Sequence, residues 1–225
     1  MLFVIAIIGI MVAIALPVFN GVLERAKVTK DLSNLRQIGM ATQLYMNDNS
    51  GVLFSTGSSW MSQLYSVNAA TPKYLSSWKV LVSPFDPVAN PAVPNRTAST
   101  NNAKSAVSYG INATSGVVGI SADRISKPAV FIVFGPAQDS TSTAVRFQGV
   151  GDTTSDTNLA ASSNVKVVAN TSNPGGTATG GTHSSRTKIN ALFADWHVET
   201  MLWSGTGPAF TNTTATGSDP DGAYR

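Results

Sequence analysis

The chain has only two histidines, His183 and His197, and both lie close in sequence to Asp195. Imidazole nitrogens and carboxylate oxygens are common zinc ligands, so these three side chains would form a metal site if the fold brought them together. Asp195 is also a frequent turn residue, and a turn or loop cluster explains all three residues without a metal. We favour the turn or loop cluster. Asp219 and Asp221 are candidate calcium ligands, but two carboxylates are too few to define a site.

The composition argues against most other chemistry. The absence of cysteine excludes disulfides, cysteine-ligated zinc and a thiol nucleophile. The sequence has no G-x-S-x-G motif, and the glycine pairs at 175–176 and 180–181 lack the spacing of a phosphate-binding loop. The net charge is +3 without a dense run of lysine and arginine, so we expect no specific binding of nucleic acid. We therefore predict that the protein is not an enzyme and uses no cofactor or bound metal.

The histidine cluster lies in the most regular part of the second half of the chain. Residues 189–203 contain an almost wholly apolar arm before Asp195-Trp196 and an arm with alternating side chains after it, a pattern that predicts a β-hairpin with a tight turn. Residues 129–134 (AVFIVF) are typical of a buried strand, and residues 145–150 and 165–168 are weaker strand candidates. These segments predict a mostly antiparallel sheet joined by long loops.

The first 19 residues carry no charge and no strongly polar side chain. A helix of this length spans roughly 28 Å, about the hydrocarbon thickness of a bilayer. We do not expect a cleaved signal peptide, because the basic n-region and a clear A-x-A site are both missing. The remaining alternatives are a plain membrane anchor and a helix that moves from a membrane into an assembly. We favour the second.

The helical pattern continues beyond this apolar run to about Asn47. An apolar stripe recurs at spacings of three and four residues, formed by Val28, Leu32, Leu35, Ile38, Ala41, Leu44 and Tyr45. Charged residues, Asp31 among them, are expected on the other faces. The pattern predicts one helix of roughly 70–75 Å, far longer than is usual in globular proteins. It divides the chain into an apolar stem, residues 1–27, and a globular head, residues 28–225.

Two residues weaken the stem. Gly9 lowers helix propensity by about 1 kcal/mol relative to alanine. Pro17 removes a backbone donor and clashes with the preceding turn, which costs about 3 kcal/mol in a helix interior. One interpretation is a kink of the kind that membrane helices tolerate. The alternative is that the backbone between Gly9 and Pro17 unwinds and stretches.

The first fifty residues resemble a known family. Residues 3–49 are similar to the N-terminal region of type IV pilins and type II secretion pseudopilins, especially those with a long polar C-terminal domain. The similarity includes the apolar run, Gly9, Pro17 and the L-x-x-L-R-x-I-G stretch at Leu32–Gly39. The resemblance implies an α+β pilin-like fold, in which a long N-terminal α-helix packs on a mostly antiparallel β-sheet with long loops.

Shorter stretches farther along the chain also resemble the family. The C-terminal family motif is represented by His183, Asn190, Asp195 and His197. The SPFDP stretch at 83–87 and the SYGIN stretch at 108–112 resemble two further landmarks of the family. The family has an Asp-Gly turn where this chain has Asp195-Trp196. Because tryptophan takes positive φ only at a steric cost, we expect another turn type or a longer turn, and an exposed Trp196 would be a candidate contact for a neighbouring subunit.

The resemblance implies a structural role. Such subunits wait in the bacterial inner membrane, are trimmed and N-methylated by a prepilin peptidase, and are extracted by assembly machinery into an extracellular helical filament of identical subunits. The expected filament-core residues are Phe3, Ile5, Ile7, Ile8, Ile10, Val12, Ile14 and Leu16. In related filaments the helix between the matching glycine and proline is unwound, which implies the same for Gly9–Pro17.

Two alternatives stay open: a pseudopilin of a type II secretion system, and a membrane-anchored periplasmic domain that binds a ligand. The family's mature chain begins with a few residues, usually Phe-Thr-Leu-x-Glu, before the point where Met1 stands here. We therefore expect this sequence to start a few residues inside the mature chain, just after the family's assembly glutamate.

Overall fold

The computed structural model describes residues 2–54, 60–65, 73–86, 108–111, 121–125, 127–129, 131–136 and 181–202. These residues form an α+β fold with one long helix and a four-stranded antiparallel sheet, as expected. The strand candidates at 145–150 and 165–168, and the calcium candidates Asp219 and Asp221, lie outside the described residues.

Helix α1 (Leu2–Asp48) is the longest element among the described residues. Its 47 residues correspond to about 70 Å of helix, which confirms the predicted length. The helix ends where Asn49, Ser50 and Gly51 form a turn, with Ser50 and Gly51 both at positive φ. The Gly51 amide donates to the carbonyl oxygen of Met46 at 2.8 Å, which satisfies one of the last helical carbonyls.

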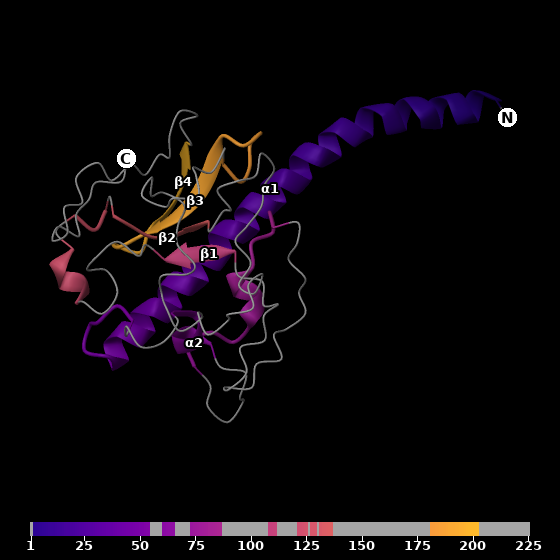
Figure 1. The fold of residues 1–225 in the computed structure, drawn as a ribbon. Coiled ribbons are helices and arrows are strands. Elements are labelled where there is room, and N and C mark those ends of the chain that lie inside the picture. Colours follow the sequence, from indigo (N-terminus) through magenta and orange to yellow (C-terminus); the bar gives the residue numbers. More distant parts are fainter. Residues whose placement is uncertain are drawn as a thin grey trace, which may run out of the picture.

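The N-terminal part of α1 projects away from the rest of the protein (Figure 1). The large apolar side chains between residues 3 and 14 are 50–86% exposed. This part of the helix is long and apolar enough to cross a membrane. The backbone is helical throughout, including Gly9 and Pro17, so the predicted weak segment is wound in the isolated chain.

The sheet contains β1 (Tyr109–Ile111), β2 (Ile132–Pro136), β3 (Lys188–Phe193) and β4 (Val198–Leu202), in that spatial order. All three pairings are antiparallel, and β2 shifts register against β3 between Ile132 and Phe134. The strand predicted at 129–134 corresponds to β2, which begins three residues later and ends two residues later than expected. Its five residues are buried, because the sheet lies against the head half of α1 (Figure 1).

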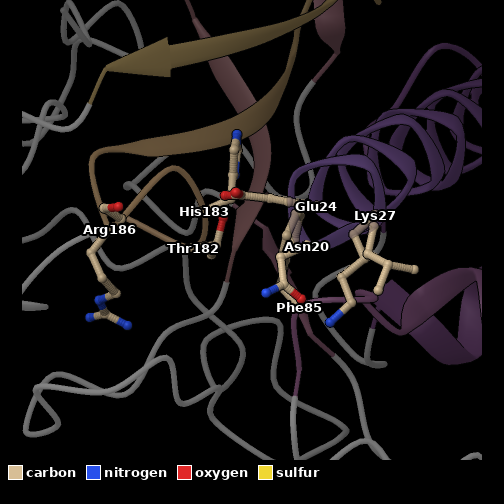
Figure 2. A pocket seen from close by; sticks show the side chains of 9 residues that line it. Asn20, Glu24, Lys27, Phe85, Thr182, His183 and Arg186 are labelled. Atoms are coloured by element: carbon tan, nitrogen blue, oxygen red, sulfur yellow. Dashed lines mark hydrogen bonds between the residues drawn. The ribbon is translucent and has the colours of Figure 1, made fainter. Parts of the chain in front are cut away.

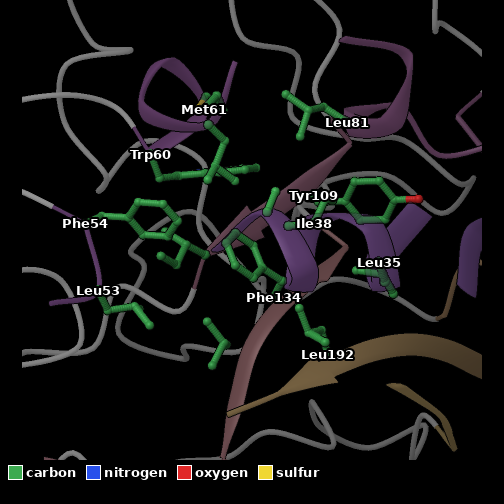
Figure 3. Packing of buried hydrophobic residues seen from close by; sticks show 14 of the residues in the cluster. Leu35, Ile38, Leu53, Phe54, Trp60, Met61, Leu81, Tyr109, Phe134 and Leu192 are labelled. Carbon is green, nitrogen blue, oxygen red and sulfur yellow. The ribbon is translucent and has the colours of Figure 1, made fainter. Parts of the chain in front are cut away.

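Helix α1 and the sheet enclose one hydrophobic core (Figure 3). Leu35 and Ile38 of α1 are fully buried, and so is Phe134 of β2. The short helices α2 (Trp60–Leu64) and η1 (Trp78–Leu81) add aromatic rings to the core. The Trp60 ring packs edge-on against Phe134, with ring centroids 4.8 Å apart.

The apolar stripe predicted on α1 is partly wrong. Leu44, which was expected in the buried stripe, is 53% exposed. Asp31, which was expected on another face, is only 4% exposed. Gly39 is also buried and allows α1 to approach β3 closely. A Cβ atom added at Gly39 would lie 3.2 Å from Leu192 Cδ1, so the end of the Leu192 side chain would have to shift by a few tenths of an ångström to admit a larger residue.

The β3–β4 hairpin confirms the predicted hairpin and settles its turn. The Trp196 amide donates to the Phe193 carbonyl at 2.9 Å, and the Phe193 amide donates to the His197 carbonyl at 3.0 Å. This is a three-residue loop, a reverse turn followed by a residue in the left-handed region. That residue is Trp196, with φ of +71°. Its ring is half-buried and packs on the core instead of being fully exposed, and its Cε3 atom lies 3.7 Å from the position of a Cβ at Gly39.

The positive φ of Trp196 can be tested by comparing Trp196→Gly with Trp196→Ala. Both variants lose the contacts of the indole ring, but only alanine retains the steric cost of the left-handed conformation. We expect Trp196→Gly to be about 1 kcal/mol more stable than Trp196→Ala in urea denaturation of the detergent-solubilised chain.

Ala194→Gly provides the control, because Ala194 lies in the same loop without positive φ. This control should be less stable than the wild type by about 0.5–1 kcal/mol. Equal stability of the two Trp196 variants would contradict a left-handed conformation at this position.

Candidate functional site

The most unusual group in the head is the buried carboxylate of Asp31, on helix α1. Its Oδ1 atom accepts hydrogen bonds from Ser83 Oγ at 2.5 Å and Tyr109 Oη at 2.6 Å. Its Oδ2 atom accepts one from Asn190 Nδ2 at 2.7 Å. We call these four residues the Asp31 network. The three donors come from the segment after η1, from β1 and from β3, so one carboxylate joins the long helix to three separate parts of the head.

A second layer of hydrogen bonds orients the donors. Thr200 Oγ1 on β4 donates to Asn190 Oδ1 at 2.7 Å, which turns the Asn190 amide nitrogen toward Asp31. Thr200 lies directly opposite Asn190 in the β3–β4 register. Asn34, one turn along α1 from Asp31, donates to the Val82 carbonyl oxygen at 2.9 Å. The helix is therefore tied to β3–β4 and to the η1 segment at nearly the same level.

Burial and the hydrogen bonds of this network have opposite effects on the pKa of Asp31. Burial raises the pKa of Asp31 above its ordinary value of 3.8, while the bonds from Ser83, Tyr109 and Asn190 oppose that rise by stabilising the carboxylate. Burial, together with the neighbouring Asp31, raises the pKa of Tyr109 well above its ordinary value. The Tyr109 hydroxyl therefore keeps its proton and remains a donor.

The landmark stretches of the sequence meet at this network. Ser83 belongs to the SPFDP stretch, and Tyr109 belongs to the SYGIN stretch. The two stretches also contact each other directly, because Ser108 Oγ donates to Asp86 Oδ2 at 2.8 Å. Asn190 comes from the C-terminal family motif. Segments that are far apart in the chain are thus held around one carboxylate.

The other residues of the C-terminal family motif lie at the two ends of β3. His183 is buried before the strand begins, whereas Asp195 and His197 lie in the turn after it. A strand of six residues separates them by roughly 20 Å, so His183 cannot share one metal ion with Asp195 and His197. Among the described residues, no group of three histidine, aspartate or glutamate side chains is placed to hold a metal.

Asp195 and His197 brace the hairpin turn. The His197 backbone amide donates to Asp195 Oδ1 at 3.2 Å, and His197 Nδ1 also contacts that oxygen. The His197 ring stacks on Phe193, with centroids 4.2 Å apart and ring planes 7° apart. The geometry matches the turn cluster that the sequence favoured for these two residues.

Seven of the eight stem residues predicted for a filament core lie in the described part of the chain, and their side chains are exposed. Phe3, Ile5, Ile7, Ile8, Ile10, Val12 and Ile14 are all exposed. Apart from the backbone of the helix itself and the two neighbouring residues, no atom lies within 4 Å of a Cβ placed at Gly9. The side chains of Leu16 and Pro17 lie outside the described part of the chain. The apolar stem is therefore available for contacts with lipid or with another protein.

Sequence reasoning missed Asp31, which it placed among the charged residues of the outer faces. A signal was present: Asp31, Leu35, Ile38 and Tyr45 follow one another at helical spacings on the buried face. An acidic residue within such a stripe indicates a buried, hydrogen-bonded carboxylate. The strand β1 was missed as well, since its three residues Tyr-Gly-Ile are too short to give a periodic signal.

Comparisons of the chain with family models, with curated proteins and with solved structures found no match. The fold and the site define an α+β protein whose long N-terminal helix is joined to a four-stranded antiparallel sheet by a buried carboxylate.

Removal of the Asp31 carboxylate should destabilise the head. Asp31→Ala leaves the Ser83 and Tyr109 hydroxyls and the Asn190 amide without their acceptor, and we expect it to lower the free energy of unfolding by about 3 kcal/mol. Asp31→Asn keeps the volume but replaces one acceptor oxygen with a donor, and a loss of about 1–2 kcal/mol is expected. Lys30→Ala, at the exposed neighbouring position, should change the stability by less than about 0.5 kcal/mol in the same urea titration.

The raised pKa of Asp31 makes this site's contribution depend on pH. Because the folded-state pKa exceeds the unfolded value of 3.8, the native state binds the Asp31 proton more readily than the unfolded chain. This contribution is fully present below pH 3.8 and is lost as the pH rises through the raised pKa. The stability of the wild type minus that of Asp31→Asn should therefore increase as the pH is lowered toward 3.8. A difference that shrinks on acidification would contradict the raised pKa.

Proposed function

We propose that the protein is a structural subunit that polymerises, through its apolar N-terminal helix, into an extracellular filament of the type IV pilus kind, with a pilin-like fold. The observation that carries this proposal is that one uninterrupted helix has two different surroundings. Its residues 3–14 expose large apolar side chains, while one face of its residues 31–45 is packed in the core of the head. Such a helix holds an exposed apolar stem at a fixed orientation relative to the folded head.

The exposed stem needs a covering that the isolated chain does not provide. Contiguous apolar surface of this extent on a protein indicates a membrane or protein contact. Because the first 19 residues of the stem are apolar on every face, lipid and a bundle of identical stems are nearly equivalent surroundings for them, and side-chain packing decides between the two. Repeated head-to-tail contacts of one kind generate an open helix when the rotation does not close a ring. A subunit with such a stem could therefore be stored in a membrane and then assemble into a filament.

A filament subunit of this kind would have different partners and a different location before and after assembly. Before assembly the subunit would lie in the bacterial inner membrane, where a prepilin peptidase and assembly machinery act on it. After assembly its partners would be identical subunits in an extracellular fibre. A pseudopilin of a type II secretion system would use the same stem in a shorter filament.

A membrane-anchored periplasmic domain that binds a ligand is the second candidate. Its supporting observation is that α1 alone is long and apolar enough to cross a bilayer. In that case the chain would remain monomeric in detergent and would need no contact between stems.

The filament proposal is tested by electron microscopy of the sheared extracellular fraction from cells that express the chain. We expect long fibres in which the chain is the main subunit. Ile8→Lys should reduce the fibre yield at least about tenfold, because an ammonium group in an apolar core is costly to desolvate. Ile8→Leu preserves the apolar surface and serves as the matched control.

The proposal fails if the wild-type chain is found only as a detergent-soluble monomer. Loss of protein export in a deletion strain that still carries its surface fibres would instead favour the secretion pseudopilin. The amount of each variant in the membrane fraction must be measured in parallel, so that defective insertion is not mistaken for defective assembly.

The role of the weak segment is tested within assembled fibres. Pro17→Ala restores a backbone donor in the Gly9–Pro17 segment and should favour a continuous helix there. We expect fibres of this variant to differ from the wild type in helical rise or in stiffness, measured by helical reconstruction and by fibre bending. Identical helical parameters would refute an unwinding role for Gly9–Pro17.

A further inference from the structure

A cavity of about 460 Å³ lies where the stem joins the head, between α1 and the turn that precedes β3 (Figure 2). Leu23, Glu24 and Lys27 line it from the helix, and His183 and Arg186 line it from the turn. We call it the neck pocket. Its volume lies in the range of small-molecule sites, and none of its residues belongs to the Asp31 network.

The turn that forms one wall of the pocket is strained. Ser184, Ser185 and Arg186 all have positive φ, between 52° and 69°, although none is glycine. Such residues cost of order 1–3 kcal/mol each and persist only where surrounding contacts hold them. Gly181 permits the fold of this segment, because a Cβ there would lie 2.3 Å from the Lys188 carbonyl oxygen.

Glu24 fastens this turn to the helix. Its Oε1 atom accepts a hydrogen bond from the Ser184 backbone amide at 2.6 Å. The Thr187 and Lys188 amides close the turn by donating to the His183 carbonyl oxygen at 3.1 and 3.2 Å. Arg186, the last residue of this turn with positive φ, is one of the residues that line the pocket (Figure 2).

Several buried polar atoms at the pocket have no partner among the described residues. The Nε and Nη1 atoms of Arg186 are buried without an acceptor. His183 is 4% exposed, and its Nε2 atom is also unpaired, while its Nδ1 atom lies 3.1 Å from Thr182 Oγ1. A guanidinium nitrogen always carries hydrogen, so the Arg186 atoms lack an acceptor rather than a donor. Unpaired buried donors are rare in folded proteins and call for a partner.

The charges of the pocket define what that partner is. Among the described residues that line the cavity, two side chains are cationic, Lys27 and Arg186, and one is a carboxylate, Glu24. A ligand with a single negative charge would balance them, whereas a multiply charged phosphate would leave an excess of negative charge beside Glu24. The Phe85 ring, which stacks on His183 with centroids 5.1 Å apart, provides an apolar wall for the carbon skeleton of such a ligand.

We propose that the neck pocket binds a carboxylate group, with Arg186 as its main hydrogen-bond donor. The carboxylate is either that of a small organic acid or an acidic side chain of a second copy of the chain. Both sources have the same chemistry at the pocket. The first source is independent of filament formation, and the second rests on the proposed polymerisation.

Binding is tested on the full chain in neutral detergent by thermal melting in sodium acetate and in sodium chloride of equal ionic strength. For a dissociation constant of about 10 mM, acetate at about 200 mM should raise the melting temperature by about 4 °C more than chloride does. Arg186→Gln should abolish this difference. Lys30→Gln removes an exposed lysine of α1 that does not line the pocket, and it should retain the difference.

The same acetate titration can be followed at the Arg186 Nε–H resonance by nuclear magnetic resonance, which needs no variant. A saturating shift of that resonance supports the site even if Arg186→Gln fails to fold. The proposal is overturned if acetate and chloride act alike on the wild type and the resonance does not move. It is also overturned if folded Arg186→Gln keeps the full acetate effect.

Fibre yields then identify the source of the carboxylate. If acetate binds and Arg186→Gln forms far fewer fibres than Lys30→Gln, the pocket accepts an acidic side chain of a second copy. If acetate binds and the two variants assemble equally, the pocket accepts a free organic acid. A wild type that binds acetate but forms no fibres refutes the proposed filament function and leaves the free acid as the source.

Discussion

The buried carboxylate of Asp31 is the interaction on which the arrangement of the head depends. A buried carboxylate is tolerated where hydrogen-bond donors stabilise it, and here Ser83, Tyr109 and Asn190 supply three of them. Hydrophobic packing alone would let a smooth helix slide or rotate on a sheet, because apolar contacts have little directionality. Three directed hydrogen bonds from three segments remove that freedom. Together with the close approach at Gly39, they fix both the height and the rotation of α1 against β3.

This constraint explains how a head with a small sheet and several irregular segments holds a helix of such length. The four strands are short, and the sheet could not define the position of α1 by area alone. The network distributes that task among elements with little regular structure of their own, such as the segment after η1. The same elements would be expected to separate together if the Asp31 carboxylate were lost, since they share one acceptor group.

The sequence predicted the features that arise from periodic patterns, namely the long helix, its apolar stem and the β3–β4 hairpin. It could not predict contacts between segments far apart in the chain, and the Asp31 network consists entirely of such contacts. Leu44 was misplaced because apolar character was taken as burial, although single exposed apolar residues are common on protein surfaces. For the turn at Trp196, the sequence predicted only that it would differ from the Asp-Gly turn of the family. Its indole ring packs on the core, and that contact lies outside any local rule.

The continuity of α1 has a mechanical consequence. Because stem and head share one helix, a pull applied to the stem reaches the head along the helix axis. The Asp31 bonds and the Glu24–Ser184 bond all connect that axis to segments beside it, so such a load would act on them in shear and in parallel. Bonds loaded in parallel must break nearly together, whereas bonds loaded in series break one at a time. The head is therefore built to resist tension along its stem more strongly than peeling across it.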